Sequence, residues 1–474
     1  MASFIVLLAI VAHRFLRLDL LDERIARLHP PAVLAVLLAL ALGWDVLRGG
    51  LRLRAQALLM VQWALCGWAA VCKLVADGVA GMRAFVSSNY LKDVVFLTLV
   101  GVLSGTLERL RTLIWVFVAV MTFVAAVVTP QRVGDRRCYY YDYGRSQGLN
   151  YEQKTDGRPC LAAADCYELP AGEQHLRGMS WACERRGPLG LATVVERARY
   201  VGSMAEPNSM SLALVMGCAL ALGLATWPRG RRRGSRGLLR VVLLASTALM
   251  TAAVLAAASR AGQAALALML VTLVLLRIGP WAAVLMAPLA LPLALLSTRR
   301  TAEAAYSTTT RVRTMLNGYQ AYLDHPLFGV GLDNYGRISD LNAHNSFILA
   351  ATECGILGIG LFVLGVYLAL KLLVKVWRWP RAEQEPASLE ELRHLAAILL
   401  AMLVGVCSCI TFESLSFDVM WLFPVGMLAA FYRVVQEEIP AFELDLHIGE
   451  ILAALAVGAL VPPVIVGVTT ALVY

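Results

Sequence analysis

Charge is scarce in this 474-residue sequence. Only 16% of the residues are charged, whereas 59% are apolar, and the mean hydropathy is +0.67. These values exclude a soluble enzyme and are typical of a polytopic membrane protein. The sequence also lacks a nucleic-acid-binding motif and a set of residues spaced as metal ligands. We therefore expect no nucleic-acid partner, no metal and no other cofactor.

Two further absences bear on organisation. No small-residue cleavage site follows the first apolar run, residues 2–12, so we expect no cleaved signal peptide. That run is short for a membrane span, and the amphipathic, Arg-rich stretch 15–28 is of the kind that lies at a membrane surface. Whether residues 1–28 span the membrane stays open. No internal repeat is evident, which argues against a transporter of lipid-linked glycans.

Apolar runs of membrane-spanning length recur along the chain. Because lipid offers no partners to backbone polar groups, we expect an all-α bundle of about 12 or 13 transmembrane helices. After residues 2–12, the predicted spans are 31–47, 55–75, 90–107, 110–128, 208–227, 239–258, 263–276, 279–296, 346–374 (with a break near Gly355), 395–412, 419–432 and 448–473.

Two long polar segments separate these spans and define the expected domains. They are N-terminal transmembrane helices (1–128), a cysteine-containing loop (129–199), central transmembrane helices (200–297), a second polar loop (298–344) and C-terminal transmembrane helices (345–474). The two loops are long enough to fold as a small cap with structure of their own.

Arginines are unevenly distributed among the connections. Six of them fall in residues 228–240, which marks this connection as cytoplasmic. Counting spans outward makes the basic segment 371–381 cytoplasmic as well, in agreement with the rule. The loops 129–199 and 298–344 then both lie on the outer face. The Arg-rich stretch 15–28 falls there too, which goes against the rule.

The ten cysteines fall into two sets. Six lie in or beside apolar runs and behave as small buried hydrophobes: Cys66, Cys72, Cys218, Cys354, Cys407 and Cys409. The other four share the loop 129–199: Cys138, Cys160, Cys166 and Cys183. Four cysteines in one extracytoplasmic loop predict two disulfides, although the sequence leaves their connectivity open.

Several polar residues fall on the predicted outer face beside apolar spans. Guanidinium groups are planar, permanently charged and able to bind two phosphate oxygens at once. Arginines on the outer face, where few are expected, therefore indicate a bound anionic lipid headgroup or pyrophosphate. The polar residues are Arg199, Asn208, Ser259, Arg260, Arg311, Arg313, His344 and Asn345.

These residues also have structural interpretations. Arg199 could extend its charge to a membrane interface, and Asn345 could cap the helix that follows it. We interpret Glu353, inside an apolar run, as a partner for an arginine or a backbone group rather than as a base. His344 is either a hydrogen-bonded interface residue or a catalytic base that works near neutral pH.

Four motifs together resemble the O-antigen ligase and polymerase superfamily. HPLFGVG (325–331) and AHNSFILAATECGILG (343–358) resemble its His-motif region, RYVGSMAEPN (199–208) its Arg-x-x-Gly…Pro-Asn element, and SRAG (259–262) its Ser-Arg turn. The resemblance implies a metal-independent, inverting glycosyltransferase of the membrane-embedded GT-C class. It also implies the bacterial inner membrane, with the active site facing the periplasm.

The resemblance further implies substrates and roles. The donor is a glycan on undecaprenyl pyrophosphate, and the acceptor is a sugar hydroxyl of the lipid A core in ligases or of another lipid-linked glycan in polymerases. Carried over by position, Arg199 and Arg260 bind the pyrophosphate, with Arg311 as a third candidate, and His344 activates the acceptor. The supporting residues are Asn208, Ser259, Asn345 and Glu353.

The chain departs from the ligase pattern in one respect. Ligases have a long outer loop before the His motif, whereas the segment before His344 is moderate in length here. The larger outer insertion is the cysteine-containing loop. This difference keeps a polymerase as the alternative to a ligase.

Overall fold

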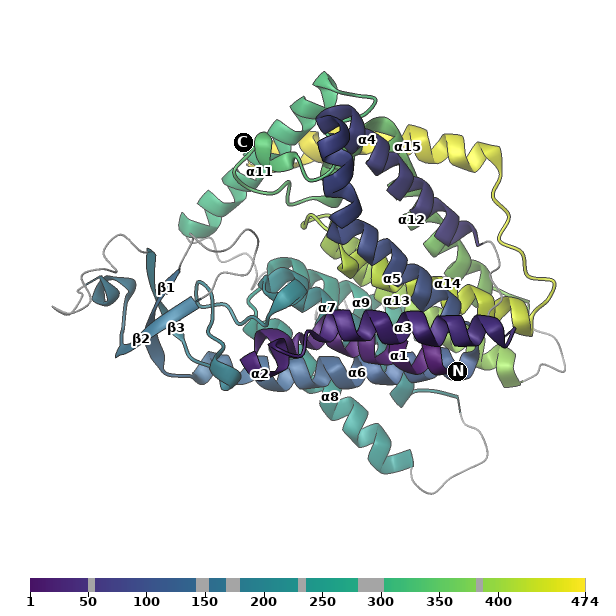
Figure 1. Cartoon of the computed structure of the whole chain (residues 1–474), viewed down its shortest axis with the longest axis horizontal. Helices are drawn as coiled ribbons and strands as arrows, with labels where there is room; N and C mark the ends of the chain where they lie inside the picture. Colours follow the sequence, from purple (N-terminus) through teal and green to yellow (C-terminus); the bar gives the residue numbers. More distant parts are fainter. Residues whose placement is uncertain are drawn as a thin grey trace. The chain divides into compact units, whose positions relative to one another are not determined.

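The computed structural model describes residues 1–49, 56–141, 153–167, 180–228, 236–279, 302–380 and 387–473. Among them, ten helices are long and apolar enough to cross a membrane (Figure 1). The predicted all-α polytopic membrane protein is confirmed. The span predicted at residues 279–296 lies outside the described residues except for Gly279, so the total number of spans stays a prediction.

A described helix overlaps each of the other predicted spans, although several ends differ. The largest difference is in the span predicted to end at residue 75, which belongs to α4 (Ala57–Ser87) and continues to Ser87 past a break at Gly78. The polar residues in this extension obscured it in the sequence. The short run at the N-terminus is the helix α1 (Ala2–Leu16).

The chain divides into two compact units, each assembled from separate stretches. The first unit comprises Met1–Asp45, Ile114–Thr226 and Arg231–Leu266. The second comprises Val46–Leu113, Trp227–Gly230 and Ala267–Tyr474.

The first unit is built around α7 (Pro207–Ala225). Pro207 stands at its start, where the missing N–H of proline breaks no helical hydrogen bond. Almost every side chain of α7 is buried, and the helix lies against α8 (Arg236–Ala256). Gly217 brings it close to α6 (Leu107–Val128), because a Cβ there would lie 2.8 Å from the Cβ of Met121. The other helices of the unit are α2 (Glu23–Ala26), α3 (Pro30–Leu47), η1 (Leu18–Leu20), η2 (Thr129–Val133), η5 (Pro188–Gly190), η6 (Gly202–Met204) and the start of α9 (Arg260–Ile278).

The cysteine-containing loop folds as a small sheet within the first unit. Its strands β1 (Arg136–Tyr141), β2 (Gln153–Pro159) and β3 (Ser180–Arg185) are antiparallel in the order β2-β1-β3 (Figure 1). Disulfides join Cys138 to Cys166, at the end of η3 (Ala163–Cys166), and Cys160 to Cys183. With Trp181 these cysteines make the sheet's own apolar cluster. So small a core is stabilised largely by such cross-links.

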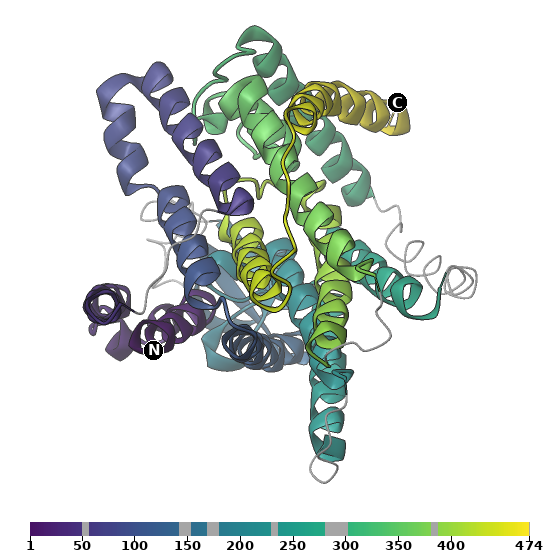
Figure 2. The ribbon, with the colours of Figure 1, turned by 90° about the vertical axis from the view of Figure 1, so that its right-hand side faces the viewer.

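The second unit is built around α12 (Ser346–Trp377). This helix lies against α4, α11 (Ala302–Asp324), α13 (Ala387–Ile410) and α15 (Ile448–Val473), as Figure 1 and Figure 2 show. A second contact joins α5 (Asn89–Leu103) to α14 (Val419–Glu438), where Gly101 and Gly426 allow close approach. A short 3₁₀ helix, η7 (Tyr335–Arg337), lies in the loop before α12. Polar α11 occupies much of the segment predicted as the second outer loop.

Candidate active site

The helix α12 is interrupted at Gly355, whose φ of +64° is left-handed and suits glycine. A break of this kind leaves helix carbonyls without their usual N–H donors. The preceding loop supplies the missing donors: Val330 N–H donates to the Thr352 carbonyl at 2.9 Å, and Gly331 N–H donates to the Glu353 carbonyl at 3.0 Å. The HPLFGVG motif therefore completes the helix that carries the second motif.

The other side of the break is completed in the same way. Ile356 N–H donates to the Pro326 carbonyl at 2.8 Å, and Trp68 Nε1 of α4 donates to the Cys354 carbonyl at 2.7 Å. The backbones approach so closely that a Cβ on Gly355 would lie 2.2 Å from the carbonyl oxygen of Leu327. Two motifs that are separate in sequence thus form one interlocked structure, which we call the α12 interlock (residues 326–331 with 352–356).

Glu353 has a structural role in this interlock. Its side chain is only 3% exposed, and its Oε1 accepts a hydrogen bond from Tyr335 N–H at 3.1 Å. The Tyr335 hydroxyl in turn donates to the Thr314 carbonyl of α11 at 2.6 Å. The carboxylate therefore anchors the loop to α12. Its partner is a backbone N–H group, one of the two kinds of partner that the sequence suggested for Glu353.

A charged cluster ties the same loop to α4. Lys73 Nζ lies 2.9 Å from both Asp77 Oδ2 and Asn334 Oδ1, and Arg337 Nη1 lies 2.8 Å from Asp77 Oδ1. Sequence reasoning missed these residues. The signal that could have revealed them is a Lys and an Asp one turn apart near the end of an apolar run, where ionisable groups are costly unless paired.

His344 and Asn345 stand at the start of α12. The Asn345 Oδ1 atom accepts hydrogen bonds from Phe347 N–H and Ile348 N–H, both at 2.9 Å, so Asn345 caps the helix. Its Nδ2 donates to the Thr411 carbonyl at 2.8 Å. His344 has a φ of +50°, an uncommon conformation outside glycine. The cap and this turn together define where the imidazole lies.

The imidazole of His344 is half-buried. Burial lowers the pKa of His344 to about 4, and the positive charge of Arg311 acts in the same direction. His344 is therefore neutral at pH 7 and able to accept a proton. Arg311 is half-buried on α11, whereas Arg313 is exposed on the same helix.

In the first unit, Asn208 and Ser259 are hydrogen-bonded to each other. Ser259 Oγ donates to Asn208 Oδ1 at 2.7 Å and accepts from Gly262 N–H at 3.0 Å, at the start of α9. Arg197 Nη2 donates to the same Asn208 oxygen at 2.6 Å, and Arg197 Nε donates to the Ala257 carbonyl at 3.1 Å. Arg197 was missed in the sequence because it precedes the matched motif by two residues.

The two arginines predicted for this region have different surroundings. Arg199 is only 8% exposed, and its Nε donates to the Ala192 carbonyl at 3.2 Å. The Gln131 side chain binds both the N–H and the carbonyl of Arg199. Arg260 is exposed at the first residue of α9. Arg260 is thus the more accessible of the two to a ligand.

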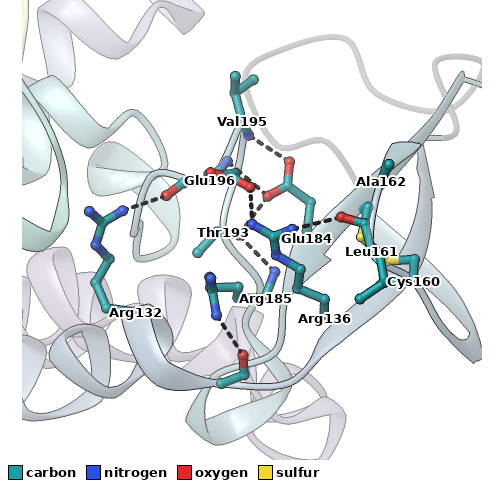
Figure 3. Close-up of polar contacts among 12 residues, drawn as sticks. Arg132, Arg136, Cys160, Leu161, Ala162, Glu184, Arg185, Thr193, Val195 and Glu196 are labelled. Atoms are coloured by element: carbon teal, nitrogen blue, oxygen red, sulfur yellow. Dashed lines mark hydrogen bonds and ion pairs between the residues drawn. A yellow bond between two sulfur atoms is a disulfide. The ribbon is translucent and has the colours of Figure 1, made fainter. Parts of the chain in front are cut away.

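A buried carboxylate holds the turn that carries Arg197. Glu184 of β3 accepts hydrogen bonds from the Thr193 hydroxyl, from Val195 N–H at 2.6 Å and from Glu196 N–H at 3.1 Å (Figure 3). Val195 and Glu196 have φ values of 50° and 58°, and such strained conformations persist only where surrounding contacts maintain them. The sheet therefore supports the segment that leads to the Asn208–Ser259 pair.

Comparison with known families identifies part of this region. Residues 245–363 match a family model described as O-antigen ligase. The match places this stretch of the chain in the O-antigen ligase superfamily. A search of curated proteins finds no match.

Some of the candidate residues of the two units fall within the O-antigen ligase match, and others fall outside it. Ser259, Arg260, Arg311, His344, Asn345 and Glu353 fall within it. The preceding residues Arg197, Arg199 and Asn208, like the cysteine-containing sheet, lie outside the matched stretch. The family match and the ten membrane-spanning helices among the described residues support a multi-pass membrane protein from a family of O-antigen ligase or polymerase enzymes.

Among the described residues, one group of side chains lies close enough together to hold a metal ion. The sulfur atoms of Cys138, Cys160 and Cys166 lie within 4.8 Å of one another. All three cysteines are in disulfides, so they offer no thiolate to a metal. The group belongs to the core of the sheet.

Proposed function

We propose that the protein is a metal-independent, inverting glycosyltransferase of the GT-C class. It moves a glycan from undecaprenyl pyrophosphate to a sugar hydroxyl of the lipid A core or of a growing polysaccharide, at the periplasmic face of the bacterial inner membrane. The observation that carries the proposal is His344, a neutral imidazole placed by the Asn345 cap within the O-antigen ligase match.

In the proposed reaction, His344 accepts the proton of the acceptor hydroxyl as its oxygen attacks the anomeric carbon of the donor. The bond from that carbon to the pyrophosphate oxygen breaks, and the configuration inverts. Undecaprenyl pyrophosphate leaves with the bonding electron pair. A base with a pKa of about 4 is weak, but the negative charge of a bound pyrophosphate would raise that pKa toward neutrality.

The arginines would stabilise the charge that develops on the leaving group. Arg260 is exposed at the start of α9, where backbone N–H groups also favour an anion. Arg311 adds a half-buried positive charge in the neighbourhood of His344. We assign Arg199 as a third cation of the donor site. Arg197, Asn208 and Ser259 would hold the turn that presents Arg260.

A polymerase is the second candidate. The described segment before His344 consists of α11 and a short loop, whereas the larger polar insertion is the disulfide-bonded sheet. This distribution differs from the ligase pattern and favours an acceptor other than the lipid A core, such as a second lipid-linked glycan.

The test is transfer by the purified protein with a repeat linked to undecaprenyl pyrophosphate as donor, in the presence of EDTA. Lipid A core and a second lipid-linked repeat would be supplied in parallel. Product on lipid A core would support the ligase, and a ladder of longer lipid-linked chains would support the polymerase. Absence of product with both acceptors, across several glycan structures, would refute the proposed glycosyltransferase.

A further inference from the structure

A cavity of about 360 Å³ lies within the second unit. Its wall combines the start of α5, the loop before α12, α12 itself and the segment before α14. Three of the residues that line it are carboxylates, namely Asp333, Glu353 and Asp418. Among the described lining residues there is no cationic side chain, so the cavity disfavours a phosphate or a carboxylate ligand.

The rest of the lining suits a neutral, hydroxyl-rich molecule. Asn89 and Asn342 contribute amides, which both donate and accept hydrogen bonds. The carboxylates offer hydroxyl donors the lone pairs that remain after Glu353 accepts from Tyr335 N–H and Asp418 accepts from Met420 N–H. The aromatic rings of Tyr335 and Phe417 add apolar surface on which the C–H face of a sugar can pack.

Beside this cavity lies a buried hydroxyl without a hydrogen-bond partner among the residues that the structure describes. Tyr90 lines the cavity, is only 3% exposed and packs edge-on against Phe417, with ring centroids 5.0 Å apart. Its hydroxyl makes no hydrogen bond within the described part of the chain. The Oγ atom of Ser414, another lining residue, is in the same situation. Buried polar groups are normally paired, because an unpaired group costs about 1–3 kcal/mol. Each of these two oxygens has almost no accessible surface, so they belong to the packed wall behind the cavity rather than to the surface that a ligand would contact.

The cavity shares its supporting elements with the proposed catalytic base. Asn342 lies two residues before His344. The apolar cluster that contains Ala343, next to His344, also contains Tyr335 and Leu349 of the cavity wall. A ligand in the cavity would therefore be held by the same loop and helix that place the imidazole.

We propose that this cavity is the acceptor subsite, and that it selects an uncharged sugar over a sugar bearing a phosphate or carboxylate group. That the bound sugar is the acceptor of the reaction rests on the function proposed above. The preference for an uncharged sugar rests only on the lining of the cavity.

Binding without donor tests the cavity independently of transfer. The probes are neutral core oligosaccharides, each paired with the same oligosaccharide carrying a uronic acid, titrated into full-length protein in detergent. We expect the acidic partner to bind about tenfold more weakly, the size of one lost hydrogen bond to a charged group. Equal affinity within each pair, or no binding of any neutral probe, would overturn the proposal.

Two variants change the charge of the cavity in opposite directions. Asp333→Asn keeps the shape of a side chain whose φ of 58° asparagine also tolerates, and should reduce the preference for the neutral probe several-fold. Asn342→Asp alters an exposed residue and should increase that preference. Asp340→Asn removes an exposed carboxylate outside the lining and serves as the matched control. An unchanged preference in both cavity variants would contradict the subsite.

Asp333→Asn and Asn342→Asp should change the KM for the acceptor while the KM for the donor stays unchanged. If transfer is absent but the neutral preference is present, the proposed function fails and the cavity stands. If transfer occurs and both cavity variants behave like Asp340→Asn, the proposed function stands and the subsite fails.

Discussion

At the scale of single residues, His344 combines two unusual properties. Its backbone is left-handed, and its imidazole is held neutral by burial and by the nearby charge of Arg311. Histidine normally changes charge in the physiological range, which makes it a useful switch. The lowered pKa of this residue keeps it unprotonated throughout the physiological range instead. The pH dependence of transfer therefore tests whether His344 is the base.

We predict that kcat/KM for transfer falls only as the pH drops below about 5, because kcat/KM reports the free enzyme and the pKa of free His344 is about 4. A pH–rate profile of the purified protein measures this. An acid limb centred near pH 6.5 would contradict the assignment of His344. His344→Ala should abolish transfer without loss of folded protein, and His344→Gln is the control that retains a polar side chain.

The same lowered pKa has a consequence for stability. Between about pH 4 and 6.5 the unfolded chain binds a proton at this histidine more readily than the folded protein does. The stability that His344 contributes is therefore complete above pH 6.5 and is lost as the pH falls through that window. His344→Gln should flatten the pH dependence of thermal stability there.

Arg260 gives a second residue-scale prediction. Arg260→Ala should weaken donor binding by about tenfold or more, whereas Arg260→Lys should weaken it less, because lysine keeps the charge but loses the planar fork. Titration with undecaprenyl pyrophosphate measures the affinity. Arg313→Ala, at an exposed position on α11, is the control. Equal affinity in the wild type and both Arg260 variants would exclude Arg260 from the donor site.

At the scale of elements, the α12 interlock explains why two glycine-containing motifs occur together. The loop supplies N–H donors to the helix carbonyls that lose their usual partners at the break. The glycine at position 355, which has no Cβ, lets the loop backbone approach the helix closely. Neither segment satisfies its backbone alone, and buried backbone groups are rarely left unpaired. The loop and the helix therefore should form and be lost together.

Gly355→Ala tests this dependence. The added Cβ would lie 2.2 Å from the Leu327 carbonyl oxygen, at a φ that alanine adopts only with strain. We expect a loss of stability of about 2–4 kcal/mol, seen as a clear drop in the melting temperature in detergent. Gly67→Ala in α4 is the matched control, since nothing lies within 4 Å of its added Cβ. Equal melting temperatures for the two variants would contradict the interlock.

The sequence predicts local features of this site and not its long-range pairings. Apolar run length predicts the spans, and residue type predicts the break at Gly355 and the cap at Asn345, because each depends on neighbours in the chain. The choice of Trp68 as the donor to Cys354 joins two distant segments, and no periodicity encodes it. Arg197 was missed because it lies two residues before the recognised motif, and the structure reveals its contact with Asn208.

At the scale of the whole molecule, the two units are assembled from stretches that alternate along the chain. The five segments expected from polarity do not reveal this alternation, because hydropathy marks where a chain enters lipid and not which helices pack together. Orientation depends on the count of spans and on the basic connections. The cysteine-containing sheet offers an experimental check of that orientation.

We predict that non-reducing peptide mapping of membrane-extracted protein recovers the pairs Cys138–Cys166 and Cys160–Cys183. After mild reduction, a membrane-impermeant maleimide applied to spheroplasts should label these cysteines and leave the buried Cys218 and Cys409 unlabelled. Replacing one pair by serine should cost about 2–5 kcal/mol of stability in the sheet. Four free thiols would refute either the pairing or the outer location, and labelling only after permeabilisation would refute the outer location.

The contact between Glu184 and the turn at Val195–Glu196 has a consequence for biogenesis. Glu184 follows Cys183 directly, so the strand that presents this carboxylate is fixed by a disulfide. The strained turn, and with it the contact of Arg197 with Asn208, thus reaches its final geometry only in an oxidising compartment. A newly inserted chain would remain immature until its cysteines are oxidised, which delays activity until the protein has reached the side of the membrane proposed to hold its substrates.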